Sequence, residues 1–256
     1  MFLELKNVSM TFGGLVAVNE LDLTIEKNQI FSLIGPNGAG KSTVLNIISR
    51  FYQPTLGKIH FENTDMLKLK PHQVIKKGIA RSFQNVELFS NMSVIDNLKT
   101  GYHTYLKSGV FSSSFWLPNV RKEERKLHEK AMEILAAFDI EHIAKETVLN
   151  LPYGLQKQVD IARALMVNPK LLLLDEPVAG MNPTETERLG KVFQRLRDEW
   201  DITILMIEHD MSLVMDISDR IAVLEFGRKI AEGIPSEIQK DPNVIAAYLG
   251  ERVEGA

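Results

Sequence analysis

One stretch decides the fold: Gly35, Pro36, Asn37, Gly38, Ala39, Gly40, Lys41, Ser42 and Thr43. It follows an apolar run of strand length at residues 30–34 and opens a helical pattern that begins at Thr43. Glycines allow backbone N–H groups to converge on phosphate oxygens, and a following helix offers its positive N-terminal end. A lysine at this position reaches the β- and γ-phosphates, and the serine hydroxyl binds Mg²⁺. The stretch therefore predicts a phosphate-binding loop between a strand and a helix.

Three more apolar runs of strand length lie downstream, at residues 171–174, 202–207 and 221–224. Continuous apolar runs that alternate with helical patterns indicate a mostly parallel α/β sheet covered on both faces. Asp175 follows the first of these runs, and His209 closely follows the second. Because ligands bind at the carboxyl ends of parallel strands, we expect both residues to share one site with the loop.

Two regions of the chain show other patterns than this core. Residues 3–33 alternate apolar and polar side chains in two stretches, which predicts antiparallel, half-buried strands. Residues 121–138 and 156–167 show helical periodicity with no strand run between them, which indicates an inserted helical subdomain. We expect a single domain over residues 1–256, with its core at about 1–84 and 166–256 and the helical subdomain at about 85–165.

Composition excludes several classes of function. The chain has 30 basic and 33 acidic residues, and this net charge of −3 does not favour binding to nucleic acid. It contains no cysteine, which excludes disulfides, thiolate zinc sites and a cysteine nucleophile. No apolar run approaches the roughly 18 residues of a spanning helix, and the first residues do not resemble a signal peptide. We expect a soluble protein that reaches a membrane only through partners.

Asp175 and Glu176 form the second chemical element. Asp175 ends a run of four leucines, where it can hold Mg²⁺ from the tip of the strand. In an extended chain Glu176 points away from Asp175, towards the place of an attacking water. Such a pair alone would more often cap a helix, but the phosphate-binding loop upstream favours the chemical interpretation.

Several motifs occur in a fixed order along the chain. They are Phe12, the loop at residues 35–42, Gln84, the segment Leu151-Pro-Tyr-Gly-Leu-Gln156, residues 171–176, the segment Ala179-Gly-Met-Asn182, and His209. In this order the chain resembles the ATP-binding subunits of ABC transporters, from Phe2 to about Gly250. The resemblance implies a P-loop NTPase core with an N-terminal antiparallel β subdomain, and an ATPase that uses ATP and Mg²⁺.

The resemblance also implies a role for each matching residue. Phe12 would stack on adenine, although a hydrophobic residue that ends a strand is the alternative interpretation. Gln84 would reach Mg²⁺ and the attacking water. His209 would contact the γ-phosphate and hold the water and Glu176 in place. The helix near Gln156 would direct its N-terminal end at a phosphate.

The chain departs from the usual family pattern in the segment at residues 151–155 and at residue 182. The common Leu-Ser-Gly-Gly-Gln segment reads Leu-Pro-Tyr-Gly-Leu here, so Pro152 offers no hydroxyl and Tyr153 replaces a glycine, whereas Gly154 is retained. Asn182 stands where the family often has aspartate. The effect of these changes on hydrolysis and on communication between subunits stays open.

Two features resemble the subgroup that serves branched-chain amino acid importers: the Tyr-Gly pair and the ending Asp241-Pro-Asn-Val-Ile-Ala-Ala-Tyr-Leu-Gly250. Urea importers and a lipopolysaccharide exporter ATPase share a similar ending, so the solute and the direction of transport stay open. Aromatic residues in the insertion at 101–116 would touch a membrane partner or cap the core of the helical subdomain.

The resemblance implies a set of partners. Two ATP-binding subunits, identical or merely similar, would sandwich two ATP molecules, each site combining one subunit's loop with the other's residues 151–156. Integral membrane permease subunits would bind this pair at the cytoplasmic face of the cell membrane, and a substrate-binding protein would act indirectly. The alternatives are a non-transport ABC ATPase and a regulatory module that does not hydrolyse ATP. Retention of Lys41, Asp175, Glu176 and His209 argues against the second.

Overall fold

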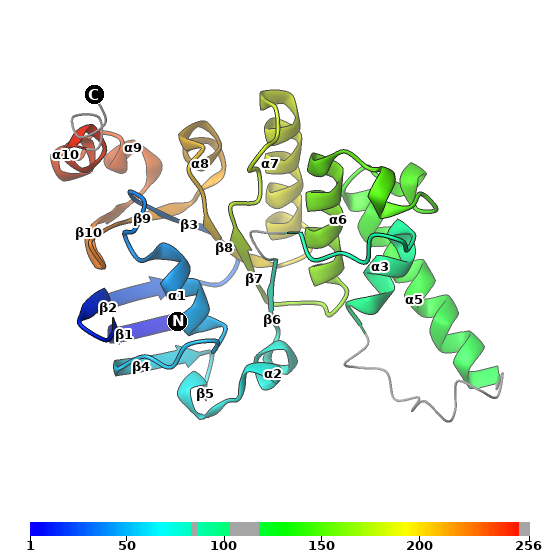
Figure 1. Ribbon diagram of the computed structural model, residues 1–256, viewed down its shortest axis with the longest axis horizontal. Coiled ribbons are helices and arrows are strands. Elements are labelled where there is room, and N and C mark those ends of the chain that lie inside the picture. Colours follow the sequence, from blue (N-terminus) through cyan, green and yellow to red (C-terminus); the bar gives the residue numbers. More distant parts are fainter. Residues whose placement is uncertain (83–85, 103–117, 251–256) are drawn as a thin grey trace.

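The computed structural model describes residues 1–82, 86–102 and 118–250. Within these residues the strands form two sheets, which lie beside each other in Figure 1. The larger sheet has the strand order β10 (Arg228–Gly233), β9 (Arg220–Glu225), β3 (Ile30–Ile34), β8 (Thr203–Ile207), β7 (Leu171–Asp175) and β6 (Ile79–Arg81). The smaller sheet has the order β2 (Leu15–Ile25), β1 (Leu3–Phe12), β4 (Leu56–Phe61) and β5 (Thr64–Asp65).

The larger sheet is mostly parallel, as the apolar runs predict. Strands β9, β3, β8, β7 and β6 pair in parallel, and only β10 runs antiparallel, against β9. Every residue of β3, β7 and β8 is buried. A strand buried on both faces has no polar side to alternate with, which explains the continuous apolar runs.

Alternate residues of the central strands enter different cores. Leu172 and Leu174 join one hydrophobic cluster, whereas Leu171 and Leu173 join the other. The first cluster is completed by the helices on one face of the sheet, and the second by α1 (Lys41–Ile48) and the small sheet. Successive side chains of a strand point to opposite faces, so this division is the expected result of the strand geometry.

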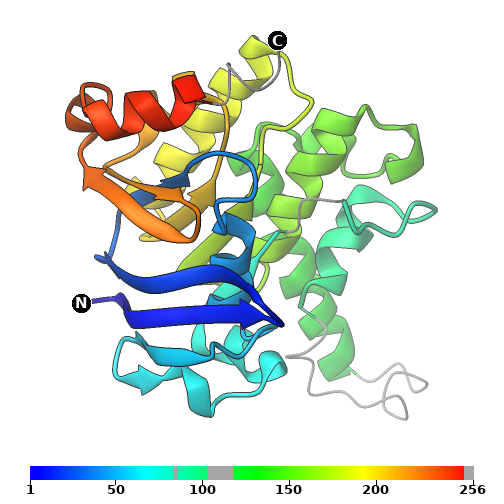
Figure 2. The ribbon, with the colours of Figure 1, turned by 60° about the vertical axis from the view of Figure 1, so that its left-hand side comes forward.

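The small sheet is antiparallel throughout, which confirms the prediction for the two alternating stretches that form β1 and β2, whereas residues 30–33 belong to β3 of the parallel sheet. Strands β4 and β5 complete it beside β1, and no sequence pattern predicted them. Figure 2 shows this sheet at the N-terminal side of the molecule, below the C-terminal helices. The side chains of Leu3, Leu5 and Leu23 are buried, so one face of the sheet is shielded from solvent.

The remaining helices are α2 (Pro71–Val74), α3 (Val94–Thr100), α5 (Pro118–Ala137), α6 (Tyr153–Leu165), α7 (Pro183–Asp198), α8 (Met211–Ile217), α9 (Pro235–Ile238) and α10 (Pro242–Gly250). Helices α3, α5 and α6 pack against one another, on the side of the larger sheet away from α9 and α10 (Figure 1). Their buried residues share one cluster with α7 and α8. The division into core and helical subdomain therefore stays a prediction, because no separate core marks it.

Both predicted helices of this region are present, with shifted ends. Helix α5 covers most of residues 121–138, and α6 begins three positions before residue 156, directly after Pro152. Proline sets its own backbone angle, here at φ −54°, and suits the entry of a helix. In the described part of the chain, none of the helices combines the length and the apolar character that crossing a membrane requires.

Candidate active site

The loop after β3 is held by close backbone contacts that only glycine allows. Gly35 and Gly40 have φ of 145° and 98°. A Cβ atom on Gly35 would lie 2.0 Å from the carbonyl oxygen of Leu224, and one on Gly40 would lie 2.3 Å from that of Ala17. The loop thus presses against β9 and β2 and delivers the chain into α1. Residues 41–43, in the first turn of α1, line the cavity beside the loop, and the first turn of a helix offers backbone N–H groups to an anion.

Lys41 begins α1 and is 6% exposed. Its Nζ donates hydrogen bonds to the carbonyl oxygens of Gly35, at 2.6 Å, and Pro36, at 2.8 Å. The ammonium group is therefore held inside the curve of the loop, where a phosphate would be bound. Its contact with the β- and γ-phosphates stays a prediction.

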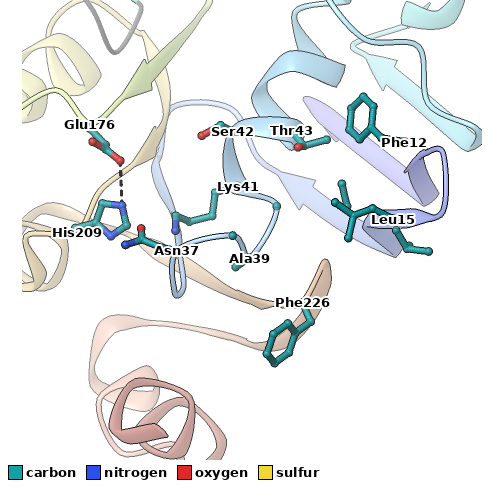
Figure 3. Close-up of a pocket in the computed structure, with 14 residues that line it drawn as sticks. Phe12, Leu15, Asn37, Ala39, Lys41, Ser42, Thr43, Glu176, His209 and Phe226 are labelled. Atoms are coloured by element: carbon teal, nitrogen blue, oxygen red, sulfur yellow. Dashed lines mark hydrogen bonds and ion pairs between the residues drawn. The ribbon is translucent and has the colours of Figure 1, made fainter. Parts of the chain in front are cut away.

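A cavity of about 400 Å³ opens beside this loop. Its lining is Phe12, Leu15, Val16, Ala17, Asn37, Gly38, Ala39, Gly40, Lys41, Ser42, Thr43, Glu176, His209 and Phe226. Figure 3 shows Phe12 and Leu15 on one side of the loop and Glu176 and His209 on the other. One end of the cavity is thus apolar and the other polar, which suits a base joined to a chain of phosphates.

Phe12 lies at the apolar end and is 40% exposed, with its ring packed edge-on against Tyr52 at 5.2 Å between centroids. Its stacking on adenine stays a prediction. Leu15 and Phe226 also line the cavity, and they were not among the predicted site residues. Phe226 is 84% exposed and has φ +44°, in the turn between β9 and β10, and no sequence pattern indicated it.

Glu176 and His209 meet across the polar end. Their Oε1 and Nε2 atoms lie 3.0 Å apart (Figure 3), which confirms that the fold brings these two predicted residues together. The backbone of Glu176 is left-handed, with φ +49°, rather than extended as expected from the sequence. Its N–H donates to the carbonyl oxygen of Ile207, which anchors this turn to the end of β8. The turn directs the carboxylate into the cavity.

Asp175 ends β7 and is 4% exposed. Its Oδ2 accepts a hydrogen bond of 3.0 Å from Nη2 of Arg81, whereas its Oδ1 is buried and has no hydrogen-bond partner among the described residues. Carboxylate and hydroxyl oxygens are ligands that Mg²⁺ prefers. The buried oxygen without a partner is therefore chemically suited to Mg²⁺, and a shared Mg²⁺ site with the hydroxyl of Ser42 stays a prediction. Arg81 was not foreseen from the sequence.

Glu208 supports the loop that carries His209. It is 3% exposed, and its carboxylate accepts hydrogen bonds from the backbone N–H groups of Val178 at 2.9 Å, His209 at 2.9 Å and Asp210 at 3.3 Å. Burial raises the pKa of Glu208, and these hydrogen bonds partly offset the rise. The residue links the turn after β7 to the turn after β8.

The segment at residues 151–156 lies at the start of α6. Gln156 Nε2 donates to the carbonyl oxygen of Leu151 at 2.8 Å, and Tyr153 is 46% exposed. Neither residue lines the cavity of its own chain, nor does Gly154. Their contact with nucleotide therefore stays a prediction that requires a second subunit. Gln84 and the aromatic residues at 103–117 lie outside the described residues.

Comparison with known proteins places the chain in a family. A profile described as "ABC transporter" matches residues 18–179, and one described as "Branched-chain amino acid ATP-binding cassette transporter" matches residues 228–254. The chain is 44% identical to the high-affinity branched-chain amino acid transport ATP-binding protein BraF of Pseudomonas aeruginosa, over 97% of this chain and 98% of that protein. It is 43% identical to the corresponding protein LivG of Escherichia coli K12, with the same coverage.

Solved structures agree. A crystal structure of the ADP conformation of an ATP-binding cassette of an ABC transporter has a TM-score of 0.84 and 32% identity, over 97% of this chain and 98% of that one. The dimeric structure of a bacterial ABC transporter cassette has a TM-score of 0.78 and 26% identity, over 91% and 99%. These matches confirm the resemblance carried by the motifs. The chain belongs to the ABC transporter family, as one of its ATP-binding ATPase proteins.

Proposed function

We propose that this ATPase powers the import of branched-chain amino acids through partner permease subunits. The observation that carries the proposal is the match of the whole chain to BraF and LivG, whose names state that transport role. The separate match at residues 228–254 supports the same subgroup. A urea importer or a lipopolysaccharide exporter has no such support in these matches.

The geometry of the cavity supports the chemistry. The base would lie at the apolar end beside Phe12, and the phosphates would lie at Lys41 and the first turn of α1. Water attacks the γ-phosphorus, the bond to the β-phosphate oxygen breaks, and ADP and phosphate leave. Glu176 accepts the proton of that water, and its hydrogen bond to His209 orients the carboxylate.

The metal site belongs to the same proposal. Ser42 and Asp175 would hold Mg²⁺, with Gln84 assigned to it by the family motif. When bound, Mg²⁺ neutralises charge on the β- and γ-phosphates.

The segment at residues 151–156 leads to the proposed pairing of two ATP-binding subunits. Tyr153, Gly154 and Gln156 would bind the nucleotide of a second ATP-binding subunit, and the dimeric cassette among the solved structures supports such a pair. Permease subunits at the cytoplasmic face of the membrane and a substrate-binding protein complete the proposed transporter. Residues at about 85–165 would form the unit that faces the permeases.

Deletion of the gene in its own host, followed by uptake measurements, tests the proposal. Cells without the protein should lose uptake of radiolabelled leucine and keep uptake of urea, and the wild-type gene should restore leucine uptake. A gene that carries Lys41→Ala should not restore it. Unchanged leucine uptake after the deletion would refute branched-chain amino acids as the transported solute. Purified protein that does not hydrolyse ATP would refute the enzymatic assignment.

A further inference from the structure

Arg81 connects the metal-binding carboxylate to the helix of the phosphate-binding loop. Its Nη2 lies 3.0 Å from Asp175 Oδ2, and the two side chains are 9% and 6% exposed. Its Nη1 donates to Asn46 Oδ1 at 2.8 Å and to Ser49 Oγ at 3.0 Å. Asn46 lies in α1 and Ser49 ends it, so one guanidinium group joins α1, β6 and β7.

The two oxygens of Asp175 are consequently unequal. Oδ2 is engaged by Arg81, and Oδ1 has no hydrogen-bond partner among residues 1–82, 86–102 and 118–250. An arginine remains charged in proteins, so a full positive charge sits beside the carboxylate that would bind a cation. In a buried site this charge is poorly screened and opposes the entry of a second cation.

The phosphates of a nucleotide reverse this balance. A nucleoside triphosphate brings several negative charges to the cavity beside Lys41 and Ser42, and these charges offset the positive charge of Arg81. The unpaired Oδ1 then completes a ligand set that the phosphates have already begun.

We propose that Arg81 is a positioning residue that makes the metal site selective for the metal–nucleotide complex. It holds Asp175 by one oxygen, and it keeps the free divalent cation out until phosphates are present. This inference rests on the proposed ATPase site, because it assigns the metal to Asp175. A purely structural strut between α1 and β7 would have no effect of this kind on metal affinity.

The test measures binding of Mn²⁺ alone to the full chain, by the electron paramagnetic resonance signal of free Mn²⁺, first without nucleotide and then with a non-hydrolysable ATP analogue. Arg81→Gln removes the charge and retains a hydrogen-bonding amide, whereas Arg81→Lys retains the charge. Without nucleotide, Arg81→Gln should bind Mn²⁺ about tenfold or more tightly than the wild type, and Arg81→Lys should stay close to the wild type. With the analogue, the difference between wild type and Arg81→Gln should shrink.

The outcomes separate the possible explanations. Damage to the fold weakens metal binding, so tighter Mn²⁺ binding by Arg81→Gln, together with wild-type binding by Arg81→Lys, indicates removal of a competing charge. Equal or weaker Mn²⁺ binding by folded Arg81→Gln without nucleotide would overturn the inference. If that variant does not fold, the wild type decides: Mn²⁺ binding that is as tight without nucleotide as with it would overturn the inference. Wild-type protein that binds the analogue but never Mn²⁺ would instead refute Asp175 as the metal ligand and, with it, the proposed site.

Discussion

His209 Nε2 lies 3.0 Å from Glu176 Oε1, although 33 positions separate the two residues in the chain. The register of two neighbouring parallel strands produces this contact, because Asp175 at the end of β7 pairs with Ile207 at the end of β8. The residues that follow both strands therefore emerge side by side. This pairing places the proposed base beside its partner, and the hydrogen bonds that Glu208 accepts from both turns hold the two loops together.

Replacement of Glu176 by glutamine should separate binding from hydrolysis. Glutamine has matching size but cannot accept the proton of water, so the rate should fall about 10²–10⁴-fold. ATP binding should survive, because Lys41 and the first turn of α1 are unchanged. With hydrolysis blocked, the ATP-bound protein should accumulate as a closed dimer. Light scattering should then measure twice the mass of the monomer.

A doubled mass only after addition of a different ATP-binding subunit would indicate a heterodimer. Wild-type rates of hydrolysis by Glu176→Gln would remove this residue from the mechanism.

Lys41→Ala should abolish tight ATP binding in a calorimetric titration. The ammonium group is the point charge inside a cradle that is otherwise made of backbone groups. Lys58→Ala is the matched control, because Lys58 is an exposed lysine of β4 outside the cavity. Undiminished ATP affinity of Lys41→Ala would show that the loop is not the binding site.

Glu208 predicts a pH-dependent stability. Its folded-state pKa is raised above the ordinary value of 4.5 by burial, so the folded protein binds more protons than the unfolded chain between the two values. This contribution to the free energy of unfolding is fully present below pH 4.5, and it is lost as the pH rises through the raised folded-state pKa of Glu208. Glu208→Gln lacks it.

Urea unfolding of both proteins at several pH values between 4.5 and 8 measures the effect. The stability of the wild type relative to Glu208→Gln should decrease towards high pH. A relative stability that is constant, or that increases with pH, would contradict the effect attributed to burial.

Asn182 should stabilise α7 through its cap. Its side chain accepts from the N–H of Glu185 at 3.0 Å, and Glu185 Oε2 accepts from the N–H of Asn182 at 3.0 Å. Asn182→Ala removes the first of these bonds and should cost about 1 kcal/mol in the free energy of unfolding. Asn182→Asp retains an acceptor and should cost less. Equal losses for both variants in urea unfolding would show that the cap is not responsible.

The sequence predicted the central strands because burial on both faces leaves an uninterrupted apolar run, as in β7 and β8. It did not reveal β6, β5 or β10. Strands β6 and β5 have three and two residues, too few to show a period. Strand β10 is an edge strand of mixed polarity, and its pairing with β9 supplies the stability that its own sequence does not indicate.

The residues of the site also fall into those that the sequence predicts and those that it does not. Lys41, Glu176 and His209 were found because the chemistry requires these residue types at fixed places in motifs. Arg81 was missed because its partner Asp175 lies 94 positions away and a single arginine at a strand end carries no pattern. Glu208 directly precedes His209 in the sequence, but its role depends on backbone N–H groups from two turns, which no sequence pattern shows.

The position of β3 determines when during synthesis the protein becomes able to bind nucleotide. This strand lies between β8 and β9, with Ile30 paired to Ile204 and Phe31 to Arg220. The phosphate-binding loop is synthesised early, whereas β8 and β9, the two strands that flank β3, belong to the last quarter of the chain. Pairings between such distant segments form late and slowly. A nascent chain therefore exposes the loop without the strands that flank β3, and we expect ATP binding only after β8 and β9 have been synthesised.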